Sequence, residues 1–291
     1  MIVEILSIIT PVFGLVLVGY LYGRRHVPDM TAANRVNLDV FIPALIFHVL
    51  SGKDFHIGDY LDLALGALIV VLGSGALALL ASRATGTAFR TLGPPTMFNN
   101  SGNMGLPLAV LAFGEEALAA AVVVFLVENL LHFTVGVRIL DPRASLLRLL
   151  RLPMVIACLL GLAFSLLAIR MPGPIALGIE MLGQIAIPLM LFALGVRLET
   201  ADWSHWRVGL GGALLRPAAG LIAVVPALLL LPLEDGLWRQ LILFAVLPPA
   251  VLNYMLAEQY GQEPETVAAI VIWGNLSSLL IIPAALFFLL R

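Results

Sequence analysis

Ten long apolar runs, joined by short polar connections, constrain this chain more than any other feature. A helix needs roughly 20 apolar residues to cross the hydrocarbon core of a bilayer. Charged residues make up 12% of the chain, against roughly a quarter in soluble domains. We therefore expect an all-α membrane protein with ten transmembrane helices. The expected spans lie near 3–23, 31–50, 60–82, 88–113, 116–138, 152–171, 174–196, 206–231, 238–258 and 265–290.

The basic residues are distributed unevenly between the two sides of the predicted spans. Eleven arginines lie near the loops that follow odd-numbered spans, four basic residues lie on the other side, and Arg216 lies within the eighth span. Because cytoplasmic loops carry the excess of Lys and Arg, this bias places both termini on the periplasmic side of an inner membrane. The first apolar run follows Glu4 rather than a basic segment, so we interpret it as a retained span and not as a signal peptide.

The order of the spans divides the chain into two halves. Residues 1–138 hold five spans, 139–151 form a basic connector that we expect to be cytoplasmic, and 152–291 hold five more. Because five is an odd number, the second half enters the membrane with the opposite orientation. If the halves share a fold, they form two inverted five-helix repeats, an arrangement found in many secondary transporters.

Two motifs recur at corresponding places in the halves. Ile-Pro-x-x-x-Phe occurs at 42–47 in the second span and at 187–192 in the seventh. Pro-Pro-x-x-x-Asn occurs at 94–99 in the fourth span and at 248–253 in the ninth. Two matches in the same order support the inverted repeat.

The fourth span and, more weakly, the ninth contain residues that disfavour a continuous helix. Proline removes an N–H donor and clashes with the preceding turn, whereas glycine and asparagine tolerate non-helical backbone. We therefore expect the fourth helix to open near Asn99–Asn103 and the ninth to break similarly. Unwound backbone at membrane depth is stable only where protein buries it or a wet cavity surrounds it. The expected crossover prolines are Pro94, Pro95, Pro107, Pro248 and Pro249.

If both broken spans open at the same depth, they cross, and the N-termini of half-helices point at the crossing. Such ends carry partial positive charge and unpaired N–H groups, which suit an anion such as a carboxylate. Asparagine amides can both donate and accept hydrogen bonds. The expected substrate-binding residues are Asn99, Asn100, Asn103 and Asn253.

Four ionisable residues within the predicted spans are candidates for ion coupling or for the lining of a cavity, since charge at that depth is costly. Glu128 lies roughly 18 Å along a span of about 30 Å, and His132 is one turn further on. Together they could carry a proton, or they could form a hydrogen bond between helices. Asp39 either lines a cavity or pairs locally. Arg216 either pairs with an acid such as Glu128, attracts an anionic substrate, or snorkels to the cytoplasmic face.

Three stretches resemble the auxin efflux carrier family, which includes the plant PIN carriers and bacterial malonate-type carriers. They are 34–48, 100–108 and 247–264, and the resemblance extends over nearly the whole chain. It implies a ten-helix fold with a scaffold domain (spans 1, 2, 6 and 7) and a crossing transport domain (spans 3–5 and 8–10). It also implies elevator-like alternating access and, commonly, a homodimer.

The resemblance further implies roles for single residues. Asn100 takes the position of the family's carboxylate-contacting asparagine, and Glu128 takes that of a glutamine near the binding site of plant carriers. This chain departs from the plant pattern at Asn99 and Asn253, where plant carriers have prolines.

We therefore expect a secondary active or facilitative transporter that moves a small organic anion across the inner membrane. Its partners would be the lipid bilayer, the anion, a coupling proton or sodium, and a second copy. We expect no nucleic acid, cofactor or metal. One alternative is a sodium- or proton-coupled symporter of the bile-acid-transporter type, which for sodium needs a compact oxygen cage beside the crossing. A remote alternative is an intramembrane serine protease that uses Ser101 and His132; otherwise no enzyme is expected.

Overall fold

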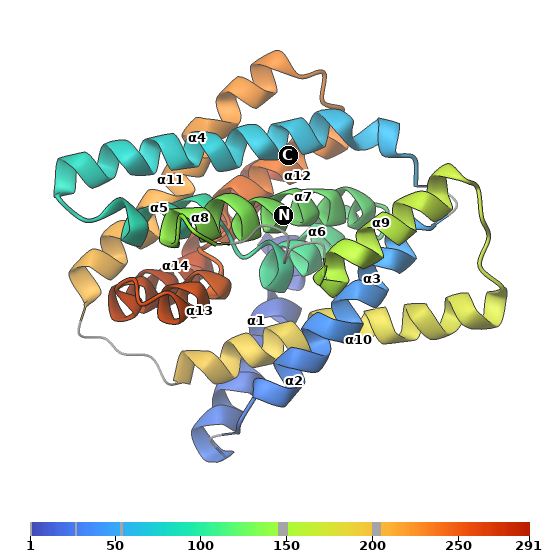
Figure 1. Cartoon of the computed structure of the whole chain (residues 1–291), viewed down its shortest axis with the longest axis horizontal. Helices are drawn as coiled ribbons and strands as arrows, with labels where there is room; N and C mark the ends of the chain where they lie inside the picture. The colour runs from blue at the N-terminus through green and yellow to red at the C-terminus, as the bar shows by residue number, and fades with distance from the viewer. Residues whose placement is uncertain (1, 27, 53–54, 145–150, 200–204) are drawn as a thin grey trace. The chain divides into compact units, whose positions relative to one another are not determined.

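Helices make up nearly all of the structure, a computed structural model that describes residues 2–26, 28–52, 55–144, 151–199 and 205–291 (Figure 1). Within these residues, seven helical segments are long and apolar enough to cross a membrane. Three further apolar segments, Ser101–Phe113, Pro153–Leu166 and Gly236–Val246, are shorter. They coincide with three of the ten predicted spans, because two of those spans are broken and the third ends early. The count of ten spans stays a prediction.

The sixth predicted span illustrates the early ending. We expected it over 152–171, but α9 ends at Leu166. Ala168 has a φ of +51°, a left-handed conformation that terminates helices, and Pro172 follows. Of the predicted connector 139–151, residues 145–150 lie outside the described residues.

The helices divide into two compact units. Unit 1 comprises Met1–Thr10, Asp62–Ala144 and Thr200–Arg291, and unit 2 comprises Pro11–Leu61 and Ser145–Glu199. Each unit therefore combines segments from both halves of the chain.

Unit 2 contains fewer of the helices than unit 1. They are α2 (Thr31–Val36), the π-helical η1 (Asn37–Phe41), α3 (Ile42–Leu50), the 3-10 turn η2 (Ile57–Tyr60), α9 (Pro153–Leu166), α10 (Gly173–Glu199) and the part of α1 (Ile2–His26) from Pro11 onward. The helix α3 packs against both α9 and α10. The rings of Phe47 and Phe164 meet edge to face at 5.2 Å, and the Ser165 hydroxyl donates to the Phe55 carbonyl oxygen at 2.9 Å.

Unit 1 holds the remaining helices. They are α4 (Leu61–Thr85), α5 (Phe89–Met97), η3 (Ser101–Gly105), α6 (Leu106–Phe113), α7 (Ala117–Leu131), η4 (His132–Gly136), α8 (Val137–Leu140), α11 (Trp206–Leu230), α12 (Asp235–Val246), α13 (Val251–Gln259) and α14 (Pro264–Leu289). The helix α11 packs along α14 and also contacts α5 and α12, while α13 and α14 lie side by side (Figure 1). Short π-helical segments such as η3 and η4 often occur at functional sites.

Candidate functional site

Two helices of unit 1 are interrupted, and their interruptions pair with each other. The helix α5 ends at Met97 and η3 begins at Ser101. The helix α12 ends at Val246 and α13 begins at Val251. The residues between them form an isolated antiparallel bridge that joins Asn99 to Pro249. We call the paired segments 98–100 and 247–250 the crossing.

Two backbone hydrogen bonds hold the crossing together. The amide of Asn100 donates to the Pro248 carbonyl oxygen at 2.7 Å, and the amide of Ala250 donates to the Phe98 carbonyl oxygen at 3.0 Å. These bonds replace the helical bonds that the interruption removes, as backbone away from water requires. The sequence located the interruptions but not their extent, since 101–105 continue as the π-helix η3 rather than as open chain.

The two Pro-Pro pairs do not occupy equivalent places. Pro94 and Pro95 lie inside α5, whereas Pro248 and Pro249 form part of the crossing itself. Asn253 lies four residues after the bridged Pro249, and Asn103 lies four residues after the bridged Asn99. The inverted repeat and its alignment on the Pro-Pro-x-x-x-Asn motif stay predictions. Pro107, the remaining crossover proline, lies in the first turn of α6, where proline is tolerated.

The side chains of Asn99 and Asn253 brace the crossing. Asn99 Nδ2 donates to the Phe244 carbonyl oxygen at 2.8 Å, so it satisfies the open end of α12. Asn253 Nδ2 donates to the carbonyl oxygens of Phe98 at 2.9 Å and Ala250 at 3.0 Å. Both side chains are buried. Among the described residues, no hydrogen bond reaches the Oδ1 atom of either asparagine.

Asn100 joins the crossing to α14. Its Nδ2 donates to Asn275 Oδ1 at 3.0 Å. Asn275 Nδ2 in turn donates to the carbonyl oxygens of Pro249 at 3.2 Å and Val271 at 2.8 Å. Asn275 is not among the predicted site residues, although a lone amide in an apolar span is a signal of a buried polar contact.

Asn103 differs from the other three predicted asparagines because it is only half-buried. It lies in η3, and the backbone N–H groups of Ser101, Gly102 and Asn103 belong to the first turn, which has no intrahelical acceptors. The first turn of η3 therefore offers N–H groups and an accessible amide side chain together.

Glu128 lies on α7 and is fully buried beside the crossing. Its carboxylate accepts a hydrogen bond from the backbone amide of Asn99. His132, one turn on, stacks on the ring of Phe98 at 4.1 Å with the planes 8° apart. Both residues therefore contact the crossing, Glu128 at Asn99 and His132 at Phe98.

Arg216 reaches the same place from α11. Its exposed fraction is 0%, so it does not snorkel to a membrane surface. Nη1 donates to the Ala245 carbonyl oxygen at 3.1 Å and Nη2 to that of Phe244 at 3.5 Å. A Cβ atom at Gly220 would overlap the Ala245 oxygen, so only glycine allows α11 to approach the end of α12 so closely. Arg216 and Glu128 are both buried beside the crossing, and their pairing, the first of the three alternatives above, stays a prediction.

Asp39 does not belong to this cluster. It lies in η1 of unit 2 and forms an exposed ion pair with Arg35 at 3.6 Å. This is the local pairing that the sequence left open for Asp39.

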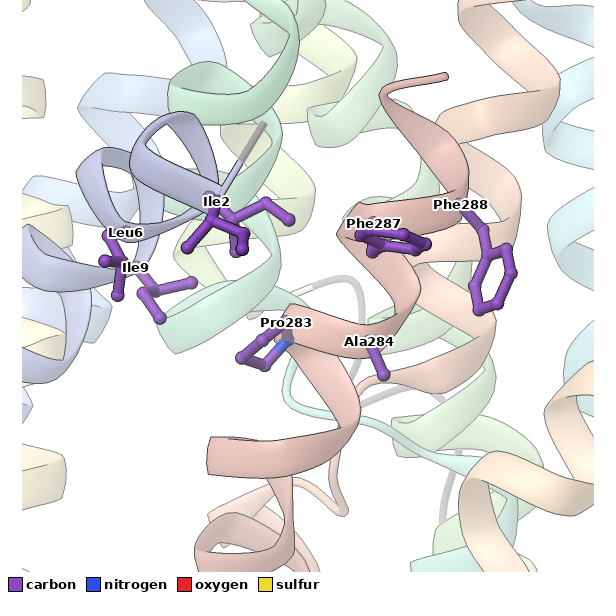
Figure 2. Close-up of a pocket in the computed structure, with 8 residues that line it drawn as sticks. Ile2, Leu6, Ile9, Pro283, Ala284, Phe287 and Phe288 are labelled. Carbon is purple, nitrogen blue, oxygen red and sulfur yellow. The ribbon is translucent and has the colours of Figure 1, made fainter.

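An apolar groove lies elsewhere in unit 1. Figure 2 shows it between the first turns of α1 and the last turns of α14. Its volume is about 450 Å³, and it is lined by Ile2, Ile5, Leu6, Ile9, Pro283, Ala284, Phe287 and Phe288. None of the predicted site residues lines this groove, and an apolar lining offers nothing for a carboxylate.

Comparison with known proteins agrees with this architecture. The family model of a membrane transport protein matches residues 4–146 and 143–286. A provisionally named malonate transporter of Rhizobium meliloti (strain 1021) is 28% identical, over 98% of this chain and 95% of its own length. An uncharacterized transporter of Methanothermobacter thermautotrophicus is 27% identical, over 92% of this chain and 93% of its own length.

A plant relative matches part of the chain. Auxin efflux carrier component 3a of Oryza sativa subsp. japonica is 29% identical over 45% of this chain and 22% of its own length. These relatives are named as transporters and carriers, so the serine protease alternative is abandoned. The apolar helices, the paired interruptions and the family match over both halves lead to one conclusion: the chain is a multi-pass membrane protein and belongs to the membrane transport protein family.

Proposed function

We propose that the chain is a secondary transporter, active or facilitative, that carries a small organic carboxylate across the inner membrane. The crossing is the observation that carries this proposal, because two interrupted helices begin new helical segments, η3 and α13, at one point. The first turns of such segments favour an anion. The relative named for malonate, a dicarboxylate, supports the choice of anion.

The contacts suggest different roles for the four asparagines. Asn99 and Asn253 use their Nδ2 groups to hold backbone carbonyls, so they shape the crossing. Asn103 is half-buried and lies at the first turn of η3, so it is the side chain best suited to contact the substrate. Asn100, held by Asn275, completes the carboxylate site from the neighbouring position.

Alternating access would follow from movement of unit 1, which contains the crossing and its hydrogen bonds, relative to unit 2. In this proposal unit 1 is the transport domain and moves as an elevator. Unit 2 is the scaffold and forms the interface of a homodimer.

Proton coupling is the second part of the proposal. While Glu128 is ionised, it balances the charge of Arg216. If Glu128 gained a proton, the Arg216 charge would be uncompensated and an anion at the crossing would be favoured. His132, stacked on Phe98, is the candidate relay for that proton.

Uptake of labelled malonate by proteoliposomes tests the site. A hydrogen bond to a charged group contributes roughly 1.5–3 kcal/mol, so Asn103→Ala should raise KM roughly tenfold to a hundredfold. The matched control is Asn129→Ala, because the Asn129 side-chain amide donates to the Phe125 carbonyl oxygen of its own helix. If Asn103→Ala keeps the wild-type KM, the carboxylate binds elsewhere. If neither malonate nor any competing mono- or dicarboxylate is taken up, the proposed substrate class is wrong.

A further inference from the structure

The end of α12 gathers oxygen atoms in the way that a cation site does. The last carbonyl groups of a helix have no intrahelical partners and carry the negative end of the helix dipole. In sodium-coupled carriers, half-helix C-termini and unwound carbonyls coordinate the ion. Here the carbonyl oxygens of Phe244 and Ala245 face one point of unit 1, and the buried carboxylate of Glu128 bonds the backbone of the crossing through Asn99.

A guanidinium already occupies that point. Arg216 bonds both carbonyl oxygens, and its side chain is completely buried. Arginine is always charged and is more weakly hydrated than an ammonium group, so it suits a buried cation position. A sodium ion at the same oxygens would have to displace the guanidinium or lie beside a like charge, and either is costly.

The surrounding chain holds Arg216 in this position. Gly220, one turn further along α11, lets the Ala245 carbonyl approach the helix. The side-chain amide of Asn99 donates to the same Phe244 carbonyl oxygen as Arg216. The backbone amide of Asn99 donates to the Glu128 carboxylate. The shared carbonyl oxygen links Arg216 to the crossing.

We propose that Arg216 is a built-in cation that permanently fills the place of a coupling sodium ion, so that this carrier binds and moves its substrate without sodium. The proposal rests on the proposed transport function and specifies its ion requirement. It argues against a sodium-coupled symporter of the bile-acid-transporter type. It is compatible with proton coupling through Glu128.

Thermal unfolding of the purified full-length protein tests the proposal without any substrate. Melting would be measured in sodium, potassium and choline chloride at equal ionic strength. The wild type should melt at the same temperature in all three salts. Arg216→Ser should lower Tm by roughly 5–10 °C, because it leaves Glu128 buried without its partner. Sodium, or guanidinium far below denaturing concentrations, should recover part of that loss relative to choline.

Arg239→Ser is the matched control. Arg239 is also an arginine that bonds a carbonyl at a helix end, through Nη1 and the Leu289 oxygen at 2.9 Å, but it lies away from the crossing. Its variant should show no difference between sodium and choline. If Arg216→Ser does not fold, Arg216→Lys keeps the charge and should remain indifferent to sodium.

Two results would overturn the proposal: a wild type that sodium stabilises more than potassium and choline, or an Arg216→Ser variant that neither cation rescues. For Arg216→Lys, a response to sodium would count against it equally. Malonate uptake by wild-type proteoliposomes should be equal in sodium and choline media. Failure to take up malonate at all would reject the proposed substrate. The melting experiment needs no substrate and would still decide whether Arg216 takes the place of a sodium ion.

Discussion

Gly220→Ala should damage the protein even though it adds a single methyl group. The new Cβ would overlap the Ala245 carbonyl oxygen and lie 2.7 Å from Arg216 Nη1. Overpacking against backbone costs about 1–3 kcal/mol, and loss of a charge-assisted hydrogen bond costs about 1.5–3 kcal/mol. The higher helix propensity of alanine offsets about 1 kcal/mol. The net destabilisation is therefore about 1.5–5 kcal/mol, or roughly 3–15 °C in Tm.

Gly211→Ala provides the comparison on the same helix. A Cβ at Gly211 meets no atom within 4 Å, so this variant should melt at or slightly above the wild-type temperature. Both variants would be purified in one detergent and unfolded by heating, with tryptophan fluorescence as the readout. If Gly220→Ala melts as high as Gly211→Ala, α11 does not approach the end of α12 as described, and the placement of Arg216 is wrong.

Three further predictions concern coupling and topology. The variants Asn100→Ala and Asn275→Ala should show a coupling of about 0.5–3 kcal/mol in a double-mutant cycle of thermal stability, and strict additivity would mean that the two amides do not bond. Glu128→Gln should bind malonate but lose its response to a pH gradient, and gradient-driven uptake at the wild-type rate would exclude Glu128 as the proton carrier. An alkaline phosphatase fused after Arg291 should be active, since the arginine bias places the C-terminus in the periplasm; a fluorescent protein that is bright there instead would reject the ten-span topology.

The helical elements could be predicted because an apolar segment inside a bilayer must satisfy its own backbone hydrogen bonds, and a helix does so. Long runs such as 60–82 and 265–290 correspond to α4 and α14 with small differences at the ends. The breaks at 98–100 and 247–250 were also predictable, since proline and asparagine accumulate there. The early end of α9 was not, because the left-handed conformation of Ala168 follows from packing and not from hydropathy.

The candidate site was predictable in its composition but not in its geometry. Motif spacing aligned Asn253 with Asn99, whereas the bridge joins Asn99 to Pro249, and pairing across 150 residues leaves no local signal. The role of Arg216 depends on how α11 packs against α12, so the sequence left three alternatives open. Which amide braces backbone and which remains accessible is likewise a property of tertiary contacts.

The prolines of the crossing also determine how its opening could be observed. Pro248 and Pro249 carry no amide hydrogen, so the segment 247–250 has exchangeable amides only at Leu247 and Ala250. The Ala250 amide is bonded across the crossing to Phe98, whereas the Leu247 amide is bonded to Phe244 within its own helix. Deuterium uptake at Ala250 therefore reports separation of the two segments with almost no background, and Leu247 reports fraying of α12 alone. A transport cycle that keeps the crossing intact would leave Ala250 protected while the protein turns over substrate.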